Sequence, residues 1–430
     1  MKVCVYGLWH LGSVTAASLA AGGFETVGLD RDRSVVDGLM AGEPPLYEPG
    51  LAELVSEGIA SGRLRFTVEP KDAMDGAAVV WVTMDTPVDD DDSADTEAVL
   101  SAVREIFPHL EDETVVVISS QLPVGSTRAL ADDYAGYTGQ RKVAFAYSPE
   151  NLRLGAALDA FGRADRVVVG TMDEPEREVL ASLVSPFTDE ILWLSVESAE
   201  MTKHALNSFL ATSVVFANEL ARVSEVVGAD ARQVETALRA DPRVGPEAYI
   251  GAGAAFAGGT LARDVRFVNE IAQHHELTTP LLAAILAANE EHARWTIRGL
   301  ADRLGGLSDC VVGVLGLAYK PGTSTLRRSS AVELCRQIAE AGGRVRAYDP
   351  VVREVADDLS FIELAESAES AARDADALVV ATSWPEFKEL SLDELVRSMR
   401  RPLILDPGRF LEKEVAHLPE VEYVGVGRPQ

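Results

Sequence analysis

The first 30 residues restrict the possible folds of this chain more than any other segment. An apolar run at Val3–Tyr6 leads into a glycine turn, a helix-like stretch from Ser13 to Ala21, and a second apolar run, Thr26–Asp30. This order of elements, a strand, a glycine turn, a helix and a second strand that ends in an acid, is a dinucleotide-binding fingerprint. The turn amides and the helix N-terminus contact the pyrophosphate, and the acid accepts hydrogen bonds from the ribose hydroxyls. The predicted cofactor contacts are Gly7, Trp9, His10, Leu11, Gly12 and Asp30.

Two of these residues bear on the identity of the cofactor. The carboxylate of Asp30 repels a 2′-phosphate, so NAD is favoured over NADP. Trp9 departs from the fingerprint, which has a glycine at this position so that the backbone can approach the pyrophosphate. We therefore expect NAD, bound at a turn with one bulky substitution.

The alternation of strands and helices continues along the chain. Strands separated by helix-like segments are typical of a doubly wound parallel sheet, the Rossmann fold, whose ligands bind at the carboxyl ends of the strands. Further strands are predicted at residues 77–82, 114–119, 142–147 and 166–170. The N-terminal domain is predicted to span residues 1–197.

A helical region and a second α/β unit complete the predicted architecture. Apolar residues at helical spacing predict a long helix from Ser198 to about Val227, followed by helices over 264–273 and 280–304. A Rossmann-like α/β domain follows, with strands predicted within 310–320 and at 344–348, 377–381 and 403–406. Its first strand is not followed by Gly-x-Gly-x-x-Gly, so a second dinucleotide site is not predicted. The expected boundaries are 198–304 and 305–430.

The charge balance and the cysteines exclude several classes of function. With 68 acidic and 39 basic residues the net charge is −29, which argues against nonspecific binding to nucleic acid or an anionic membrane. No apolar run reaches the roughly 18 residues of a spanning helix, and no targeting signal is recognised at the N-terminus. Cys4, Cys310 and Cys335 suit neither a disulfide framework nor a metal site. We expect a cytoplasmic protein without a metal.

Two local patterns carry polar groups suited to catalysis. The glycine-rich segment 249–264 could place amides around a phosphate and deliver Arg263 and Asp264 to the reacting end of the same ligand. A flexible surface loop is the alternative interpretation. Lys203 and Asn207 are four residues apart on the predicted long helix, so their side chains project from one face. For Lys203, a solvated helix face is the alternative.

The segment 249–264 resembles the substrate loop of the UDP-glucose/GDP-mannose dehydrogenase family. Gly253, Phe256, Gly258 and Asp264 fall in register with that loop, and Thr260 stands where the family has its nucleophilic cysteine. Other motifs follow in the family's order, and together they cover nearly the whole chain: Tyr47–Leu51, Thr86-Pro87, Pro123–Gly125, Ser148–Glu150, Leu152-Arg153, Lys203 with Asn207, Asp241–Gly245 and Gly316–Pro321.

The resemblance implies an NAD domain, a central helix that forms a homodimer, and a C-terminal nucleotide-sugar domain. Members of the family oxidise the C6 alcohol of a sugar nucleotide to a carboxylate with two NAD. By resemblance Asp264 with ordered water is the base, Lys203 and Asn207 stabilise the developing alkoxide, and Glu150 assists thioester hydrolysis. The remaining cofactor contacts implied are Thr86, Ser120, Gln121 and Arg327. The substrate contacts implied are Leu152, Arg153, Arg243, Tyr249, Gly253, Phe256, Gly258 and Lys320, with Arg243 reaching the substrate of the neighbouring subunit.

The threonine at position 260 leaves three hypotheses open. An alcohol is a far weaker nucleophile than a thiolate near neutral pH, so the reaction is first expected to stop after two electrons at the 6-aldehyde. The second hypothesis keeps four-electron oxidation through a hydrated aldehyde, with Thr260 and Glu150 holding the water. The third, motivated by Trp9, is an epimerase or binding protein that retains NAD.

Overall fold

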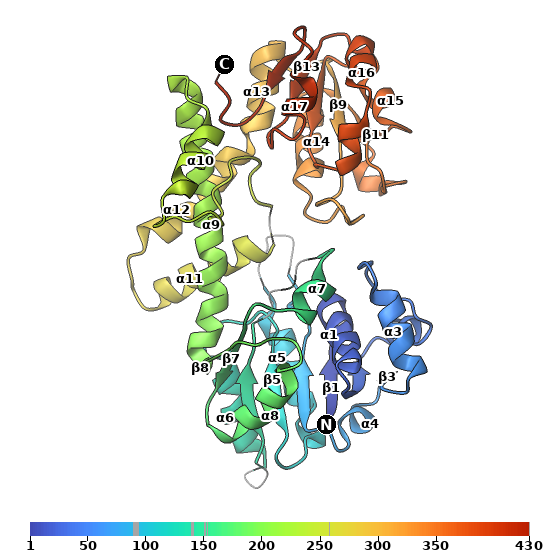
Figure 1. Ribbon diagram of the computed structural model, residues 1–430, viewed down its shortest axis with the longest axis vertical. Helices are drawn as coiled ribbons and strands as arrows, with labels where there is room; N and C mark the ends of the chain where they lie inside the picture. The colour runs from blue at the N-terminus through green and yellow to red at the C-terminus, as the bar shows by residue number, and fades with distance from the viewer. Residues whose placement is uncertain (89–93, 139–141, 150–151, 153, 258, 430) are drawn as a thin grey trace. The chain divides into compact units, whose positions relative to one another are not determined.

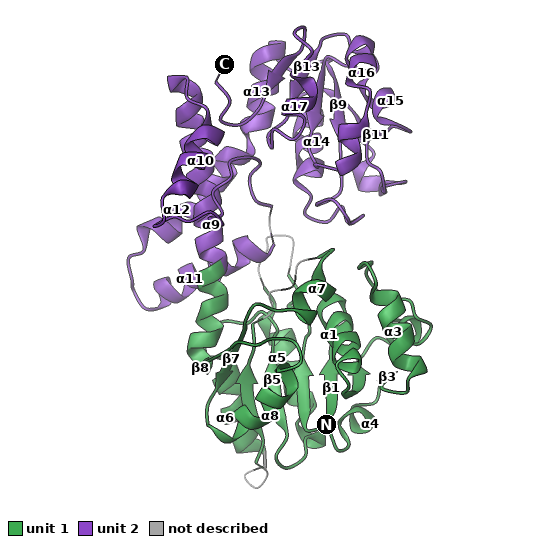
Figure 2. Ribbon diagram, viewed as in Figure 1, with its two compact units in different colours: residues 1–206 green, residues 207–430 purple. Residues whose placement is uncertain are grey.

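A computed structural model describes residues 1–88, 94–138, 142–149, 152, 154–257 and 259–429 (Figure 1). The chain divides into two compact units, Met1–Leu206 and Asn207–Gln430 (Figure 2). One helix, α9 (Val196–Val227), begins in the first unit and ends in the second. The predicted α/β fold with a long central helix is confirmed.

The first unit is a Rossmann-like sheet in the strand order β3-β2-β1-β4-β5-β6-β7-β8. Side chains alternate between its faces: Val3 and Val5 join one apolar cluster, whereas Cys4 and Tyr6 join the other. The strands are β1 Lys2–Tyr6, β2 Glu25–Leu29, β3 Leu64–Thr67, β4 Val79–Val82, β5 Val115–Ile118, β6 Ala144–Tyr147, β7 Val167–Thr171 and β8 Ile191–Ser195. The helices are α1 His10–Ala21, α2 Arg33–Met40, α3 Leu51–Ala60, α4 Pro70–Met74, α5 Thr96–Glu105, α6 Ser126–Thr138, α7 Ala157–Gly162 and α8 Pro175–Val184, with a 3-10 turn η1 at Phe107–His109.

The pairing of β6 with β7 adds a detail that the strand pattern did not predict. All other neighbours in this sheet are parallel, but Tyr147 pairs with Gly170 in antiparallel fashion. Because β7 runs antiparallel to β6, β7 begins at the edge of the sheet where β6 ends, which is also the edge of the carboxyl ends of the parallel strands. That edge is where an open α/β sheet binds its ligands.

The central helices differ from prediction at two points. The helix expected from Asp264 starts at Thr260 (α11, Thr260–His274), because Gly259 takes φ +114 and the helix begins directly after it. The helical stretch expected at 280–304 is two helices, α12 (Pro280–Ala293) and α13 (Trp295–Leu304), separated at Arg294. A further helix, α10 (Ala231–Ala240), follows α9.

The C-terminal part of the second unit is a parallel sheet in the order β11-β10-β9-β12-β13-β14. Its strands are β9 Val311–Leu315, β10 Arg344–Tyr348, β11 Ile362–Leu364, β12 Ala377–Val380, β13 Leu403–Leu405 and β14 Glu422–Val424. Its helices are α14 Ser330–Glu340, α15 Ala368–Ala372, α16 Leu392–Ser398 and α17 Glu412–Val415, with 3-10 turns η2 Asp357–Leu359 and η3 Pro385–Glu389. No helix among the described residues is long and apolar enough to cross a bilayer.

The three cysteines are structural or peripheral. Burial raises the pKa of Cys4, in β1, and of Cys335, in α14, to about 12, so neither thiol is ionised near neutral pH. Cys310 was predicted within a core strand, but it precedes β9, is only partly buried, and lies near the main-chain oxygen of Gly306. Burial also raises the pKa of Cys310.

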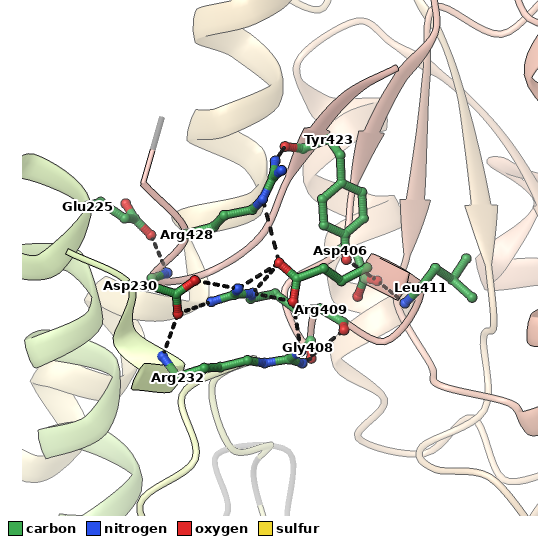
Figure 3. Close-up of polar contacts among 11 residues, drawn as sticks. Glu225, Asp230, Arg232, Asp406, Gly408, Arg409, Leu411, Tyr423 and Arg428 are labelled. Carbon is green, nitrogen blue, oxygen red and sulfur yellow. Dashed lines mark hydrogen bonds and ion pairs between the residues drawn. The ribbon is translucent and has the colours of Figure 1, made fainter. Parts of the chain in front are cut away.

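An ion-pair network ties α10 to the C-terminal sheet within the second unit (Figure 3). Arg409, which takes φ +51, forms two bonds of 2.9 and 2.8 Å to Asp230, the N-cap residue of α10. Its guanidinium also contacts Glu412 at 2.6 Å, and Arg232 reaches the same glutamate at 2.8 Å. The Arg409 side chain is only 5% exposed, so these carboxylates are needed to offset the cost of burying its positive charge.

Replacing Asp230 by asparagine is expected to destabilise the second unit by about 2 kcal/mol. The hydrogen bond from Arg409 is the main cause that lowers the pKa of Asp230 from 3.8 to about 2. A depressed carboxyl pKa stabilises the fold above the unfolded value and loses this contribution as the pH falls from about 4 to about 2. Urea unfolding at pH 7 should show the loss, and acid unfolding of Asp230→Asn should depend less steeply on pH over that interval. Equal stability of mutant and wild type at pH 7 would contradict the assignment.

Candidate functional site

The passage from β1 to α1 requires glycine at Gly7, in the turn, and at Gly12, in the first turn of α1. A Cβ on Gly7, which takes φ +94, would lie 2.5 Å from Cγ of Met84, and a Cβ on Gly12 would lie 1.7 Å from the oxygen of Gly7. Trp9 takes φ −68, which any L-residue adopts, and its side chain is 46% exposed. The N-terminus of α1 has no side-chain cap and no acid in its first turn. The tryptophan is therefore accommodated without strain, and the helix terminus suits an anion.

Asp30 lies next to this turn and differs from its counterpart in the C-terminal sheet. Its carboxylate accepts hydrogen bonds from Leu8 N at 2.6 Å and Asp32 N at 2.9 Å, and the residue remains partly exposed. Asp349, at the end of β10, is 1% exposed and accepts bonds from Leu317 N, Ala318 N and the Trp384 indole. Of these two carboxylates, Asp349 is enclosed by its donors and Asp30 is partly exposed.

A buried glutamate that the sequence analysis did not assign to the site holds His10. Nε2 of His10 lies 2.9 Å from Oε2 of Glu48, whose carboxylate also accepts bonds of 2.8 Å from Gly155 N and Ala157 N. Burial raises the pKa of Glu48, but these three donors together outweigh it, and the net shift is downward. Glu48 thus remains an anion that joins the start of α1 to the start of α7.

The carboxyl ends of β4 and β5 carry the other predicted cofactor contacts of the first unit. Oγ1 of Thr86 donates to the main-chain oxygen of Gln121 at 2.6 Å. Oγ of Ser120 is buried and has no hydrogen-bond partner in the described part of the chain. Glu200 of α9, also not predicted, is fully buried and accepts bonds from Gly125 N at 2.6 Å and Thr127 N at 2.9 Å. It caps α6 directly after the Pro123–Gly125 motif.

Two of the predicted alcohol-oxidising groups, Asn207 and Asp264, lie in contact within the second unit. Asn207 of α9 donates from Nδ2 to Oδ2 of Asp264, and Asp264 is 0% exposed. Thr260 is exposed at the first position of α11, one turn before Asp264, so the two side chains share a helix face. Lys203 is buried and lies one turn before Asn207 on α9, unlike a lysine on a solvated face.

The remaining predicted residues are placed as follows. Arg243 is exposed and pairs with Asp241, whose carboxylate lies 2.7 Å from the guanidinium. Tyr249 is exposed, whereas Leu152, Gly253, Phe256 and Lys320 are partly buried. Arg327 is exposed on the segment that precedes α14. Glu150, Arg153 and Gly258 lie outside the described residues. Within the described ranges no three metal-ligating side chains gather as a site.

Comparison with known proteins assigns a family to all three parts of the chain. Residues 1–188 match the NAD binding domain of the UDP-glucose/GDP-mannose dehydrogenase family, 197–291 its central domain, and 313–413 its UDP binding domain. The chain is 31% identical over 431 residues to UDP-glucose 6-dehydrogenase YwqF of Bacillus subtilis, covering 100% of this chain and 98% of that protein. It is 33% identical to UDP-glucose 6-dehydrogenase of Rhizobium meliloti over 437 residues, with both chains fully covered.

A solved structure of a similarly named protein has the same fold as this chain. The UDP-glucose dehydrogenase of Pyrobaculum islandicum superposes with a TM-score of 0.90 at 32% identity, covering 99% of this chain and 98% of that one. The chain therefore carries an NAD binding domain and belongs to the UDP-glucose/GDP-mannose dehydrogenase family.

Proposed function

We propose that this protein oxidises the C6 alcohol of a nucleotide sugar, a UDP-hexose, with NAD, and releases the 6-aldehyde after two electrons. The observation that carries the proposal is the exposed threonine at the first position of α11, one turn before the buried Asp264. The groups for alcohol oxidation are retained, and the nucleophile for aldehyde oxidation is replaced. The match of residues 313–413 to a UDP binding domain supports a UDP-linked sugar.

The retained groups account for the first oxidation. NAD supplies the hydride acceptor when it is bound at the β1–α1 turn. Asp264, through ordered water, takes the proton of the C6 hydroxyl, because hydride can leave only as that proton departs. Asn207 has two amide hydrogens, so it can orient Asp264 with one and contact the developing alkoxide with the other. The ammonium of Lys203 stabilises the same oxygen.

The second oxidation needs a group that Thr260 does not supply. A hydride can leave an aldehyde carbon only after a nucleophile has made it tetrahedral, and a threonine hydroxyl requires a strong adjacent base to attack. The full-length similarity to proteins named UDP-glucose 6-dehydrogenase supports the alternative, in which water adds to the aldehyde and four electrons are removed. The exposed indole of Trp9 beside the cofactor turn supports the third candidate, an epimerase or binding protein with retained NAD.

One measurement separates these three candidates. The purified protein is incubated with excess NAD and with UDP- and GDP-hexoses in turn, and the NADH formed per sugar is counted. We expect about one NADH and an aldehyde that hydroxylamine traps. Two NADH and a uronate would establish the four-electron reaction. Bound NAD with no NADH released would support the third candidate.

We further propose that the protein is a homodimer formed through α9. Phe209, Phe216 and Val223 are seven residues apart on this helix and are 67%, 51% and 59% exposed, so they form an apolar stripe. Such a stripe is suited to packing against the same helix of a second copy. We also propose that the chain consists of three domains, residues 1–197, 198–304 and 305–430, and that the central one forms the dimer. A monomer by light scattering at working concentration would refute the dimer.

A further inference from the structure

The segment that joins Tyr249 to α11 has its backbone held by side chains of neighbouring helices. Residues 250–257 contain no helix or strand. Among the described residues, three side chains make five hydrogen bonds to the main chain of this segment, and they come from Asn218 on α9 and from Asn289 and His292 on α12. Because this loop lacks the backbone hydrogen bonds of a helix or a strand, side-chain contacts of this kind are needed to hold it in one conformation.

Asn289 satisfies both main-chain groups of one loop residue. Its Oδ1 accepts from Phe256 N at 3.0 Å, and its Nδ2 donates to Phe256 O at 2.8 Å. The Phe256 ring packs against a cluster that includes Ala211, Val265 and Ile285. The asparagine and the apolar cluster therefore fix Phe256 by its main chain and by its side chain.

Asn218 and His292 hold the other end of the segment. Asn218 accepts from Gly253 N at 2.9 Å and donates to Ala254 O at 3.4 Å. Nε2 of His292 lies 2.7 Å from Gly253 O, and because a carbonyl oxygen only accepts, this nitrogen carries the hydrogen.

The imidazole of His292 is held in its neutral form. Burial is the main cause that lowers its pKa, and Arg222 and Arg298 lower it further, whereas Gly253 O and Glu291 act in the opposite direction. Its Nδ1 is buried and has no partner among the residues that the structure describes, so protonation there would gain no hydrogen bond from them. The ring thus offers one donor, and that donor is directed to Gly253.

We propose that Asn218, Asn289 and His292 are positioning residues, which set the backbone of residues 253–256 for binding of the nucleotide sugar without contacting the reacting atoms. This inference rests on the proposed function, because residues 253–256 belong to the predicted substrate loop, 249–264. The same predicted loop contains Thr260 and Asp264 at the start of α11. Since Asn207 holds Asp264 from α9 independently of the loop, loosening the loop weakens binding more than the chemical step.

The test replaces Asn289 by leucine and, separately, His292 by leucine. Asn269→Leu is the matched control, because Asn269 donates a comparable bond of 3.2 Å to Leu282 O that does not involve the loop. The first readout is hydrogen–deuterium exchange of amides 250–257 in protein without ligand. We expect about tenfold faster exchange in both test variants and no change in Asn269→Leu, because exchange reports local opening.

The second readout separates binding from chemistry. The KM for the nucleotide sugar is expected to rise about tenfold while kcat stays within about threefold, as for an interaction that contributes to binding alone. Unchanged loop exchange, or a fall in kcat at constant KM, would overturn the proposal. If no sugar is turned over even by wild type, the proposed function fails while the exchange experiment still decides the role of these residues. Two test variants keep the experiment decisive if one of them does not fold.

Discussion

Thr260→Cys is expected to raise the NADH formed per nucleotide sugar from about one to about two, with a uronate as product. Thr260 is exposed at the first position of α11, where the helix terminus lowers the pKa of a thiol and favours the reactive thiolate. Cysteine is close to threonine in size, so the substitution does not require repacking. The thiolate can add to the aldehyde and provide the tetrahedral carbon from which a second hydride leaves.

The comparison with serine isolates the effect of sulfur. Thr260→Ser retains a hydroxyl and should remain near one NADH per sugar, with aldehyde still trapped by hydroxylamine. If the serine variant forms a second NADH per sugar, or if the cysteine variant forms no second NADH, position 260 does not limit the second oxidation. Mass spectrometry of the cysteine variant after rapid quenching should detect the sugar attached as a thioester.

Asp264→Asn is expected to lower kcat for alcohol oxidation by about 10²- to 10⁴-fold, the range that a positioned general base contributes. Asp264 is fully buried and receives a hydrogen bond from Asn207, so its carboxylate is fixed in place. Asparagine has the same shape but cannot accept the hydroxyl proton. The loss should therefore appear in the chemical step, and a deuterium at C6 of the sugar should reveal whether hydride transfer remains limiting.

An exposed acid on α13 provides the control for this substitution. Asp302→Asn on α13 changes the net charge by the same amount and should leave kcat within about twofold. Unchanged circular dichroism and unchanged NAD binding in Asp264→Asn would exclude misfolding as the cause. Activity within threefold of wild type would remove Asp264 from the role of base.

Much of the fold follows from local sequence patterns. Val3–Tyr6 is a continuous apolar run and Arg344–Tyr348 alternates arginine with smaller apolar residues, and the structure places strands at both. The long helix was predicted from 198 to about 227 and spans Val196–Val227, because a period of 3.6 residues is repeated many times along it. Among strands with three residues, β13 (Leu-Ile-Leu) was predicted at 403–406, whereas β11 (Ile-Glu-Leu) was not, because a glutamate interrupts its apolar run.

The glycine turn with Asp30, the spacing of Lys203 and Asn207, and the threonine at position 260 could be recognised from the sequence, since each is a feature of residue type at short spacing. Which carboxylates and amides are enclosed became known from the three-dimensional packing. Glu48 meets Ala157, 109 residues away in the chain, and Arg409 meets Asp230, 179 residues away. Asn289 accepts a hydrogen bond from the main-chain N–H of Phe256, and because every residue except proline has this group, the sequence gives no sign of the contact. The physical reason is that burial and hydrogen-bond direction depend on the packing of distant elements, whereas local periodicity reports only the face on which a residue lies.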